Sequence, residues 1–460
     1  MFGHRFYQNV SVLSEMAAGL PGQMPEDFDH QINGEPYPDD YLRPKLAVSD
    51  VAGYLKFAAG AEPRLLGLGK AVEGVEERAQ ASCWAADSLT VTTDEALHAR
   101  IETLWDQCVD GWRVGLLCTF LVTAPVAVLE RRYGVDAVTR PHRHDTSLAS
   151  SLLLLGVQQL SRKAKRSPKA AALLAGAIDS TSWAELQRSD PEYASEVRTL
   201  LTVAGHRGPG ETELASDVYA DAPWLLLRAI SGAADREPPP PGRPDSPDAI
   251  GRLLTKASWS AIGRRERCRD AVMVLTHQLR TALREWGSRL AARSWLADAD
   301  DVFYLTYDEL CGGEPDLAGK VTRRRTERTR LAELDLPCRF RQPMDLSRQV
   351  DPAQFDRVIV GVPAVAGVAV GRVRVLRSPD DELEPGEVLV TRVTDTGWTP
   401  FFGTASAVVT DIGGAMSHAS IVARGFGIPA VVGTEHASLR LVDGQLVEVN
   451  GHEGTVTLLD

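Results

Sequence analysis

The sequence of 460 residues predicts a multi-domain protein, with a large, mainly α-helical domain followed by a small α/β domain. Two observations lead to this fold class. Residues 45–340 hold long stretches with apolar residues at helical spacing, in which Ala and Leu dominate. Residues 357–460 instead alternate short apolar strands and short helices with glycine turns. We therefore expect a helical domain over 1–340, a polar linker over 341–356 and an α/β domain over 357–460.

The helical pattern is clearest in residues 148–160 and 271–296. One face of the second segment carries Val272, Leu275, Leu279, Leu283, Trp286 and Leu290, with Arg and Glu on the other face. The proline-rich run at 236–247 cannot continue a helix, so we expect an exposed loop there. The apolar run Gly115–Leu129 is too short to span a bilayer, which favours a buried helix.

Composition argues against several partners and compartments. The net charge of -12 disfavours binding to nucleic acid or to an anionic membrane. The segment Met1–Asn9 lacks the apolar core of a signal peptide. The six cysteines are scattered, without a metal-ligand spacing or a dense disulfide framework: Cys83, Cys108, Cys118, Cys268, Cys311 and Cys338. We therefore expect a cytoplasmic protein with no bound metal and no membrane partner.

Short apolar segments after residue 357 mark the strands of one compact α/β domain. They are residues 358–362, 387–391 and 430–433, and a last hairpin uses Gly444 and Gly451 as turn residues. Residues 395–400 between them are predicted to form a turn-rich loop, because Gly and Pro punctuate this stretch.

The most informative segment, Thr410–Pro429, combines the end of a strand, a glycine pair, a histidine and a short helix. Gly413 and Gly414 let a large group approach the main chain. Ser417 is a good helix cap, which places His418 in the first helical turn. Free N–H groups and the helix dipole favour negative charge there, so a neutral imidazole can attack phosphorus and carry a phosphoryl group. The alternative is a histidine that caps a helix beside a tight turn.

This segment resembles the phosphohistidine signature of the swivelling domain of pyruvate phosphate dikinase, phosphoenolpyruvate synthase and rifampin phosphotransferase. The match covers Gly413-Gly414, Ser417-His418-Ala419, Val422-Ala423-Arg424 and Ile428–Gly433. Residues 363–375 resemble the start of that domain, and residues 395–400 resemble a loop that lies near the histidine in the family. The resemblance implies that His418 is phosphorylated and that the phosphate is bound by Gly413, Gly414, Ser417 and Arg424.

Shorter matches lie in the helical part of the chain. Gly205–Glu211, followed by Ala222–Trp224, resembles the glycine-histidine-arginine loop in the substrate domain of rifampin phosphotransferase-like proteins. Residues 298–310 resemble a segment late in that domain, and Arg5–Ser11 is similar to its first strand. We refer to residues 205–211 as the acceptor loop.

Three residues of the acceptor loop are candidates for chemistry. Arg207 offers a planar fork that binds phosphate or carboxylate. His206 can accept the proton of a substrate hydroxyl, and Glu211 can do the same or orient His206. For Arg207 and Glu211 the alternative is an ion pair that fixes the loop. For Arg424 the alternative is a structural or solvated arginine.

Full-length members of this family carry an ATP-grasp domain before the substrate domain, and we expect no such domain and no P-loop here. Phenylphosphate synthase resembles this arrangement, with its nucleotide-binding part on a separate subunit. The resemblance implies the acceptor and carrier component of a split phosphotransferase with no permanently bound cofactor. ATP and Mg²⁺ are expected on a separate ATP-grasp partner, and the acceptor is expected to be a hydroxyl of a small organic molecule, such as a natural product.

Two alternatives to phosphorylation stay open. Phosphorylation followed by elimination of phosphate gives a net dehydration, because phosphate is a far better leaving group than hydroxide. A second alternative, of a different class, is a non-catalytic binding or regulatory protein that keeps the fold. The intact glycine pair and His418 argue against that role, because a relic does not need the histidine.

Overall fold

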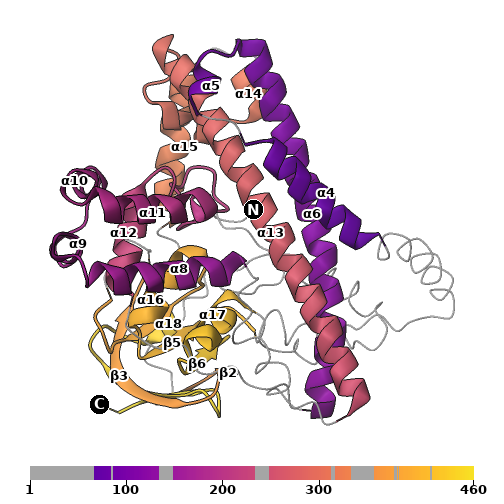
Figure 1. Ribbon diagram of the computed structural model, residues 1–460, viewed down its shortest axis with the longest axis vertical. Coiled ribbons are helices and arrows are strands. Elements are labelled where there is room, and N and C mark those ends of the chain that lie inside the picture. Colours follow the sequence, from indigo (N-terminus) through magenta and orange to yellow (C-terminus); the bar gives the residue numbers. More distant parts are fainter. Residues whose placement is uncertain are drawn as a thin grey trace.

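The computed structural model describes residues 67–83, 86–133, 149–233, 248–311, 316–332, 357–377, 381, 383–414 and 417–459. Among them, helices fill the part up to residue 332, and every strand lies after residue 357 (Figure 1). This order of helices followed by a mixed sheet agrees with the predicted fold class. The predicted strand Arg5–Ser11, the proline-rich loop at 236–247 and the linker at 341–356 lie outside the described residues. The two predicted boundaries, at 340/341 and at 356/357, therefore stay predictions.

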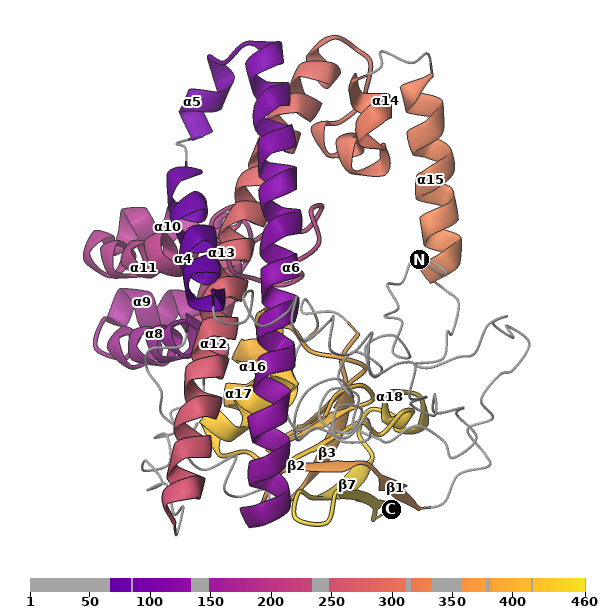
Figure 2. The same cartoon turned by 90° about the vertical axis from the view of Figure 1, so that its right-hand side faces the viewer.

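Two long helices, α6 (Asp94–Tyr133) and α13 (Ala249–Ala292), run antiparallel and dominate the helical part (Figures 1 and 2). Their 40 and 44 residues make them about 60 and 66 Å long at a rise of 1.5 Å per residue. They approach closely at Gly111, where a Cβ atom would lie 2.6 Å from Cγ2 of Val272. The side chain of Asp248 caps α13, so this helix begins well before the start that its apolar pattern predicts.

The predicted apolar face of α13 is buried against α6 and α4 (Leu68–Ala81). It contains Val272, Leu275, Leu279, Leu283, Trp286 and Leu290. The apolar run Gly115–Leu129 lies inside α6. In the part of the chain that the structure describes, no helix is long and apolar enough to cross a bilayer.

A second group of helices packs beside this pair and has a core of its own. It consists of α8 (Ala149–Ala164), α9 (Pro168–Leu174), α10 (Ser182–Ser189), α11 (Pro191–Ala204) and α12 (Pro223–Gly232). Sequence signals define several of these ends, since Ser167 and Asp190 each cap a helix that has proline in its first turn. The acceptor loop follows α11 directly, because Gly205 is the C-terminal cap of that helix.

Shorter helices lie at the end of α13 that is remote from the sheet (Figure 1). They are α5 (Ala86–Thr90), η2 (Ala299–Tyr304), α14 (Tyr307–Cys311) and α15 (Leu317–Ala332). The predicted family segment at 298–310 forms η2 and α14, with Asp298 and Asp301 in a capping box. Its place in the fold indicates a structural role.

The described part after residue 357 forms one eight-stranded mixed sheet with the strand order β1-β8-β7-β3-β4-β5-β6-β2. Strands β3, β4, β5 and β6 are parallel neighbours, and the other pairs are antiparallel. The bounds are β1 (Val358–Val360), β2 (Val362–Val365), β3 (Val368–Val375), β4 (Val388–Thr391), β5 (Ala407–Thr410), β6 (Ala430–Val432), β7 (Leu446–Asn450) and β8 (Thr455–Leu458). The predicted final hairpin is therefore β7 and β8, and Gly451 lies in its turn.

Helices cover both faces of this sheet. Helices α16 (Thr399–Thr404) and α17 (His418–Phe426) pack on the face that Val408 of β5 points to. Val409, the next residue, belongs to the opposite core, which contains α18 (Ala437–Arg440). The predicted loop at 395–400 is more ordered than expected: η4 (Thr396–Trp398) leads directly into α16, whose first turn tolerates proline.

The sheet domain packs against the second group of helices (Figure 1). Helices α16 and α17 of the sheet domain face α8 and α12 of that group. Leu154 of α8 packs against the apolar core formed by α16 and α17. Thr404 of α16 donates a hydrogen bond to the carbonyl oxygen of Gly232, at the end of α12. This packing brings the first turn of α17 up to the acceptor loop and to α13.

Candidate active site

His418 is the first residue of α17, and its position follows from the residues around it. The hydroxyl oxygen of Ser417 caps the helix by accepting from the N–H of Ser420. Ser420 in turn donates to the carbonyl oxygen of Gly414 (2.8 Å). Gly413 has φ 141°, and a Cβ atom there would lie 2.9 Å from the Ser417 hydroxyl oxygen. The glycine pair therefore folds tightly over the cap and leaves the imidazole at the helix N-terminus.

The imidazole of His418 has two different nitrogens. Nδ1 lies 3.2 Å from the hydroxyl oxygen of Thr394. Although the residue keeps some exposed surface, Nε2 is buried and has no hydrogen-bond partner among the described residues. Burial lowers the pKa of His418 to about 3, and the nearby positive charge of Arg269 acts in the same direction. The imidazole is therefore neutral at physiological pH.

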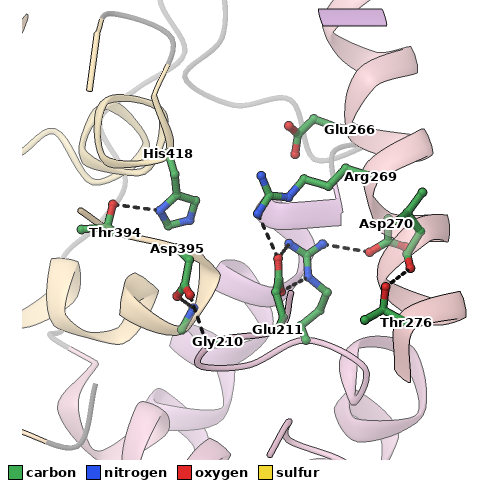
Figure 3. Close-up of polar contacts among 12 residues, drawn as sticks. Gly210, Glu211, Glu266, Arg269, Asp270, Thr276, Thr394, Asp395 and His418 are labelled. Carbon is green, nitrogen blue, oxygen red and sulfur yellow. Dashed lines mark hydrogen bonds and ion pairs between the residues drawn. The ribbon is translucent and has the colours of Figure 1, made fainter. Parts of the chain in front are cut away.

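A cluster of charged side chains from the helical part faces this imidazole (Figure 3). Glu211 comes from the acceptor loop, and Glu266 and Arg269 come from α13. The guanidinium of Arg269 donates to Glu211 (3.2 Å) and acts on the pKa of His418, which indicates that these charges are close to the ring. The candidate site is thus assembled from two separate parts of the chain.

Arg207 and Glu211 form the ion pair that the sequence left open as an alternative. Nε and Nη2 of Arg207 donate to the two carboxylate oxygens of Glu211 at 2.7 and 3.2 Å, and the side chains are only 3% and 0% exposed. Nη1 of Arg207 also donates to Asp270 (2.9 Å). Burial opposes the charge on Arg207, but the two carboxylates outweigh it and raise the pKa of Arg207. In this conformation Glu211 holds two guanidinium groups in place.

His206 lies beside the same cluster and contacts Asp270. Its Nε2 is 2.9 Å from Oδ1 of Asp270. Burial opposes ionisation of Asp270, but His206 and Arg207 outweigh it and lower the pKa of this carboxyl. A carboxylate that binds one ring nitrogen fixes the orientation of the ring, as a general base requires.

Arg424 lies on the same helix as His418 but near its other end. Its side chain is buried, and Nε donates to the carbonyl oxygen of Ala364 on β2 (3.2 Å). This contact supports the structural alternative for Arg424, and a role at the phosphate stays a prediction. Among the described residues there is no group of histidine, cysteine, aspartate and glutamate side chains that can hold a metal ion.

Sequence reasoning missed four charged or polar residues of this site: Glu266, Arg269, Asp270 and Thr394. The first three lie at helical spacing on α13, immediately before residue 271, where the apolar pattern was taken to begin. A charged face on an otherwise apolar helix is the signal that could have found them. Asp395 belongs to the loop at 395–400, which the family resemblance placed near the histidine, but it was given no role.

Asp395 is held at the boundary between the two parts of the chain. Its Oδ1 accepts from the N–H of Gly397 (2.9 Å) and its Oδ2 accepts from the N–H of Gly210 in the acceptor loop (3.1 Å). Burial raises the pKa of Asp395 to about 6, and the negative charge of Glu211 adds to this effect.

Comparison with known proteins finds matches to both parts of the chain. The family model described as the mobile domain of PEP-utilising enzymes matches residues 383–454, and the one described as the rifampicin phosphotransferase fourth domain matches residues 124–291. The sheet part of the chain therefore matches the mobile domain of the PEP-utilising class, and the helical part matches the fourth domain of rifampicin phosphotransferase. In both parts the chain is similar to proteins named rifampicin phosphotransferase.

Several relatives share long parts of the chain. An uncharacterized protein of Mycobacterium tuberculosis strain H37Rv is 36% identical over 82% of this chain and 44% of its own length. A rifampicin phosphotransferase of Streptomyces sviceus is 27% identical over 98% of this chain and 57% of its own. A chondramide synthase of Chondromyces crocatus is 37% identical over 40% of this chain and 6% of its own. The chain thus spans about half the length of the first two relatives.

A solution structure of Enzyme I also aligns, over 62% of this chain and 82% of its own, at 15% identity. Its TM-score of 0.17 is too low for a comparison of folds.

Proposed function

We propose that the protein is a phosphoryl-transfer component in which Nε2 of His418 carries the phosphoryl group and delivers it to a hydroxyl of a small organic molecule. The observation that supports this most is the state of the imidazole. It is neutral, Nδ1 contacts Thr394, and Nε2 is buried without a partner among the described residues while it faces a charged cluster. A nucleophile needs such a free lone pair.

The first step forms a nitrogen–phosphorus bond. With its proton on Nδ1, donated to the Thr394 hydroxyl oxygen, His418 presents the Nε2 lone pair to phosphorus. The bond between phosphorus and the leaving oxygen of the donor breaks, and the electron pair leaves with that oxygen. The N-terminus of α17 stabilises the negative charge of the phosphoryl group.

The second step takes place opposite the acceptor loop. The hydroxyl oxygen of the acceptor attacks phosphorus, the nitrogen–phosphorus bond breaks, and Nε2 recovers its lone pair. The hydroxyl proton goes to a base, for which His206, oriented by Asp270, is our candidate. Glu211 keeps Arg207 and Arg269 near the transferring group, where their charges stabilise the transition state.

The name of one relative supports the class of acceptor. A relative named rifampicin phosphotransferase favours an organic molecule of the rifampicin type as acceptor. The phosphoryl donor is ATP with Mg²⁺, bound by an ATP-grasp protein that works with this chain in the cytoplasm.

Chemical phosphorylation tests both steps. Phosphoramidate, a small donor that phosphorylates imidazoles, is expected to label His418, and His418→Ala removes this label while the exposed His452 still reacts. After removal of the donor, added rifampicin is expected to gain one phosphoryl group as His418 loses it. His206→Ala is expected to slow this transfer at least a hundredfold without reducing the labelling of His418. Loss of phosphate to water alone, with rifampicin unchanged, would overturn the proposed acceptor.

A second candidate function is dehydration through a phosphorylated intermediate. The contact between His206 and Asp270 favours it, because the same base can remove a carbon-bound proton while phosphate leaves. Product analysis separates the two functions. Dehydration releases inorganic phosphate and an unsaturated product, whereas phosphorylation leaves the phosphate on the acceptor.

A further inference from the structure

The segment Thr394–Trp398 contacts both the carrier histidine and the acceptor loop. Thr394 contacts Nδ1 of His418, as described above. The next residue, Asp395, accepts hydrogen bonds from its own turn, at Gly397, and from Gly210 of the acceptor loop (Figure 3). One short segment therefore links the orientation of the imidazole to the contact between the two parts of the chain.

Gly397 lies directly against the main chain of the acceptor loop. A Cβ atom at Gly397 would lie 2.1 Å from Cα and 2.6 Å from the backbone nitrogen of Pro209. Both are backbone atoms, which cannot move away as the end of a flexible side chain can. Gly210 on the other side has φ 63°, in the left-handed region that favours glycine. Only glycine at 397 permits the two backbones to meet at this distance.

We propose that the turn from Asp395 to Gly397 is the docking element that seats the His418 domain on the acceptor loop, and that Asp395 is a positioning residue for the transfer. Its carboxylate binds the main chain of both parts at once, so the seated domain has one defined orientation. In that orientation His418 faces Glu211 and Arg269. Docking also explains why Nε2 is buried, which means that His418 meets an external donor only when this contact opens.

Hydrogen exchange tests the docking element without any phosphoryl donor. Gly397→Ala places a Cβ against the main chain of Pro209, and Asp395→Ala removes the charge-assisted hydrogen bond to Gly210. Each is expected to accelerate exchange in residues 205–214 and 394–404 about tenfold or more. Gly425→Ala is the matched control, because a Cβ there lies 3.7 Å from Leu154, an ordinary contact at the same boundary.

Wild-type protection of residues 205–214 in Gly397→Ala would overturn the proposal. Protection of strands β4, β5 and β6 shows whether the domain stays folded in each variant. If Gly397→Ala lost that protection, Asp395→Ala would decide, and unchanged exchange of the acceptor loop in that variant would overturn the proposal as well.

Reactivity of the histidine gives a second readout that a purely structural residue would not change. We expect phosphoramidate to label His418 several-fold faster in Gly397→Ala than in the wild type, with His452 as the internal reference. The proposal rests on the docking contact and not on the group that is carried. If His418 were labelled in no variant, the proposed function would fail, while the exchange result would still decide the docking element.

Discussion

Substitution of Asp395 by asparagine is expected to make docking of the two parts strongly pH-dependent. In the docked structure the pKa of Asp395 is raised from 3.8 to about 6, and the pKa of His418 is lowered from 6.5 to about 3. We take the solvated values as 3.8 and 6.5 when the contact is open. A raised pKa for a carboxyl means that docking takes up a proton and is favoured below pH 6. A lowered pKa for an imidazole means that docking releases a proton and is disfavoured below pH 6.5.

These two effects oppose each other in the wild type. At pH 5, relative to pH 8, protonation of Asp395 strengthens docking about tenfold, and protonation of the open form at His418 weakens it about thirtyfold. The net change in the wild type is about threefold, or less than about 1 kcal/mol. Asp395→Asn removes the compensating carboxyl, so docking in this variant weakens by the full thirtyfold, about 2 kcal/mol. His418→Ala is expected to show the opposite sign, with docking about tenfold stronger at pH 5.

The assay is hydrogen exchange of residues 205–214 at pH 5 and pH 8, with the rates corrected for the pH dependence of chemical exchange. The exchange rate of each variant at pH 5 is compared with the rate of the same variant at pH 8. Hydrogen bonds that the substitution removes are missing at both pH values, so their loss cancels in this comparison. If docking in Asp395→Asn changed as little between pH 5 and pH 8 as it does in the wild type, the idea that Asp395 and His418 have opposing effects on docking would be refuted.

Three further substitutions test the site. Glu211→Gln removes one of the two carboxylates that pair with the buried Arg207, which keeps Asp270. The free energy of unfolding in urea is therefore expected to fall by about 1.5–3 kcal/mol, against little change for the exposed Glu327→Gln. Thr394→Val removes the partner of Nδ1, so ³¹P–¹⁵N NMR is expected to find phosphate on both ring nitrogens of His418; Nε2 alone would show that Thr394 does not select the nitrogen. Arg269→Met removes a positive charge beside the imidazole, and an NMR titration is expected to show a higher pKa for His418, whereas an unchanged pKa would mean that burial alone sets it.

Local signals were sufficient to predict the segment around His418. Ser417 caps the helix and the glycine pair folds over it within a few residues, so neighbouring sequence determines the geometry. Alternating apolar residues likewise gave most strands of the sheet, although the stretch at 395–400 is helical where a loop was expected. There the backbone contact of Gly397 and the packing of α16 outweigh the local preference of Gly and Pro for turns.

The assembled site was not predictable in the same way. Asp395 and Gly210 are separated by 185 residues, and no local pattern reports their hydrogen bond. Residues 249–270 of α13 precede the apolar segment at 271–296, and Arg269 and Asp270 at the end of this stretch contact the acceptor loop and not the core. Charged residues outside the apolar segment are thus among the ones that build the site.

The most direct test of this account is the identity of the phosphorylated atom after treatment of the whole chain with phosphoramidate. Mass spectrometry of peptides and ³¹P–¹⁵N NMR of protein with ¹⁵N-labelled histidine locate the nitrogen–phosphorus bond. We predict an acid-labile, base-stable phosphoryl group on Nε2 of His418 that is absent in His418→Ala. Phosphorylation restricted to the exposed His452, with His418 unmodified even in the open Gly397→Ala variant, would contradict the account.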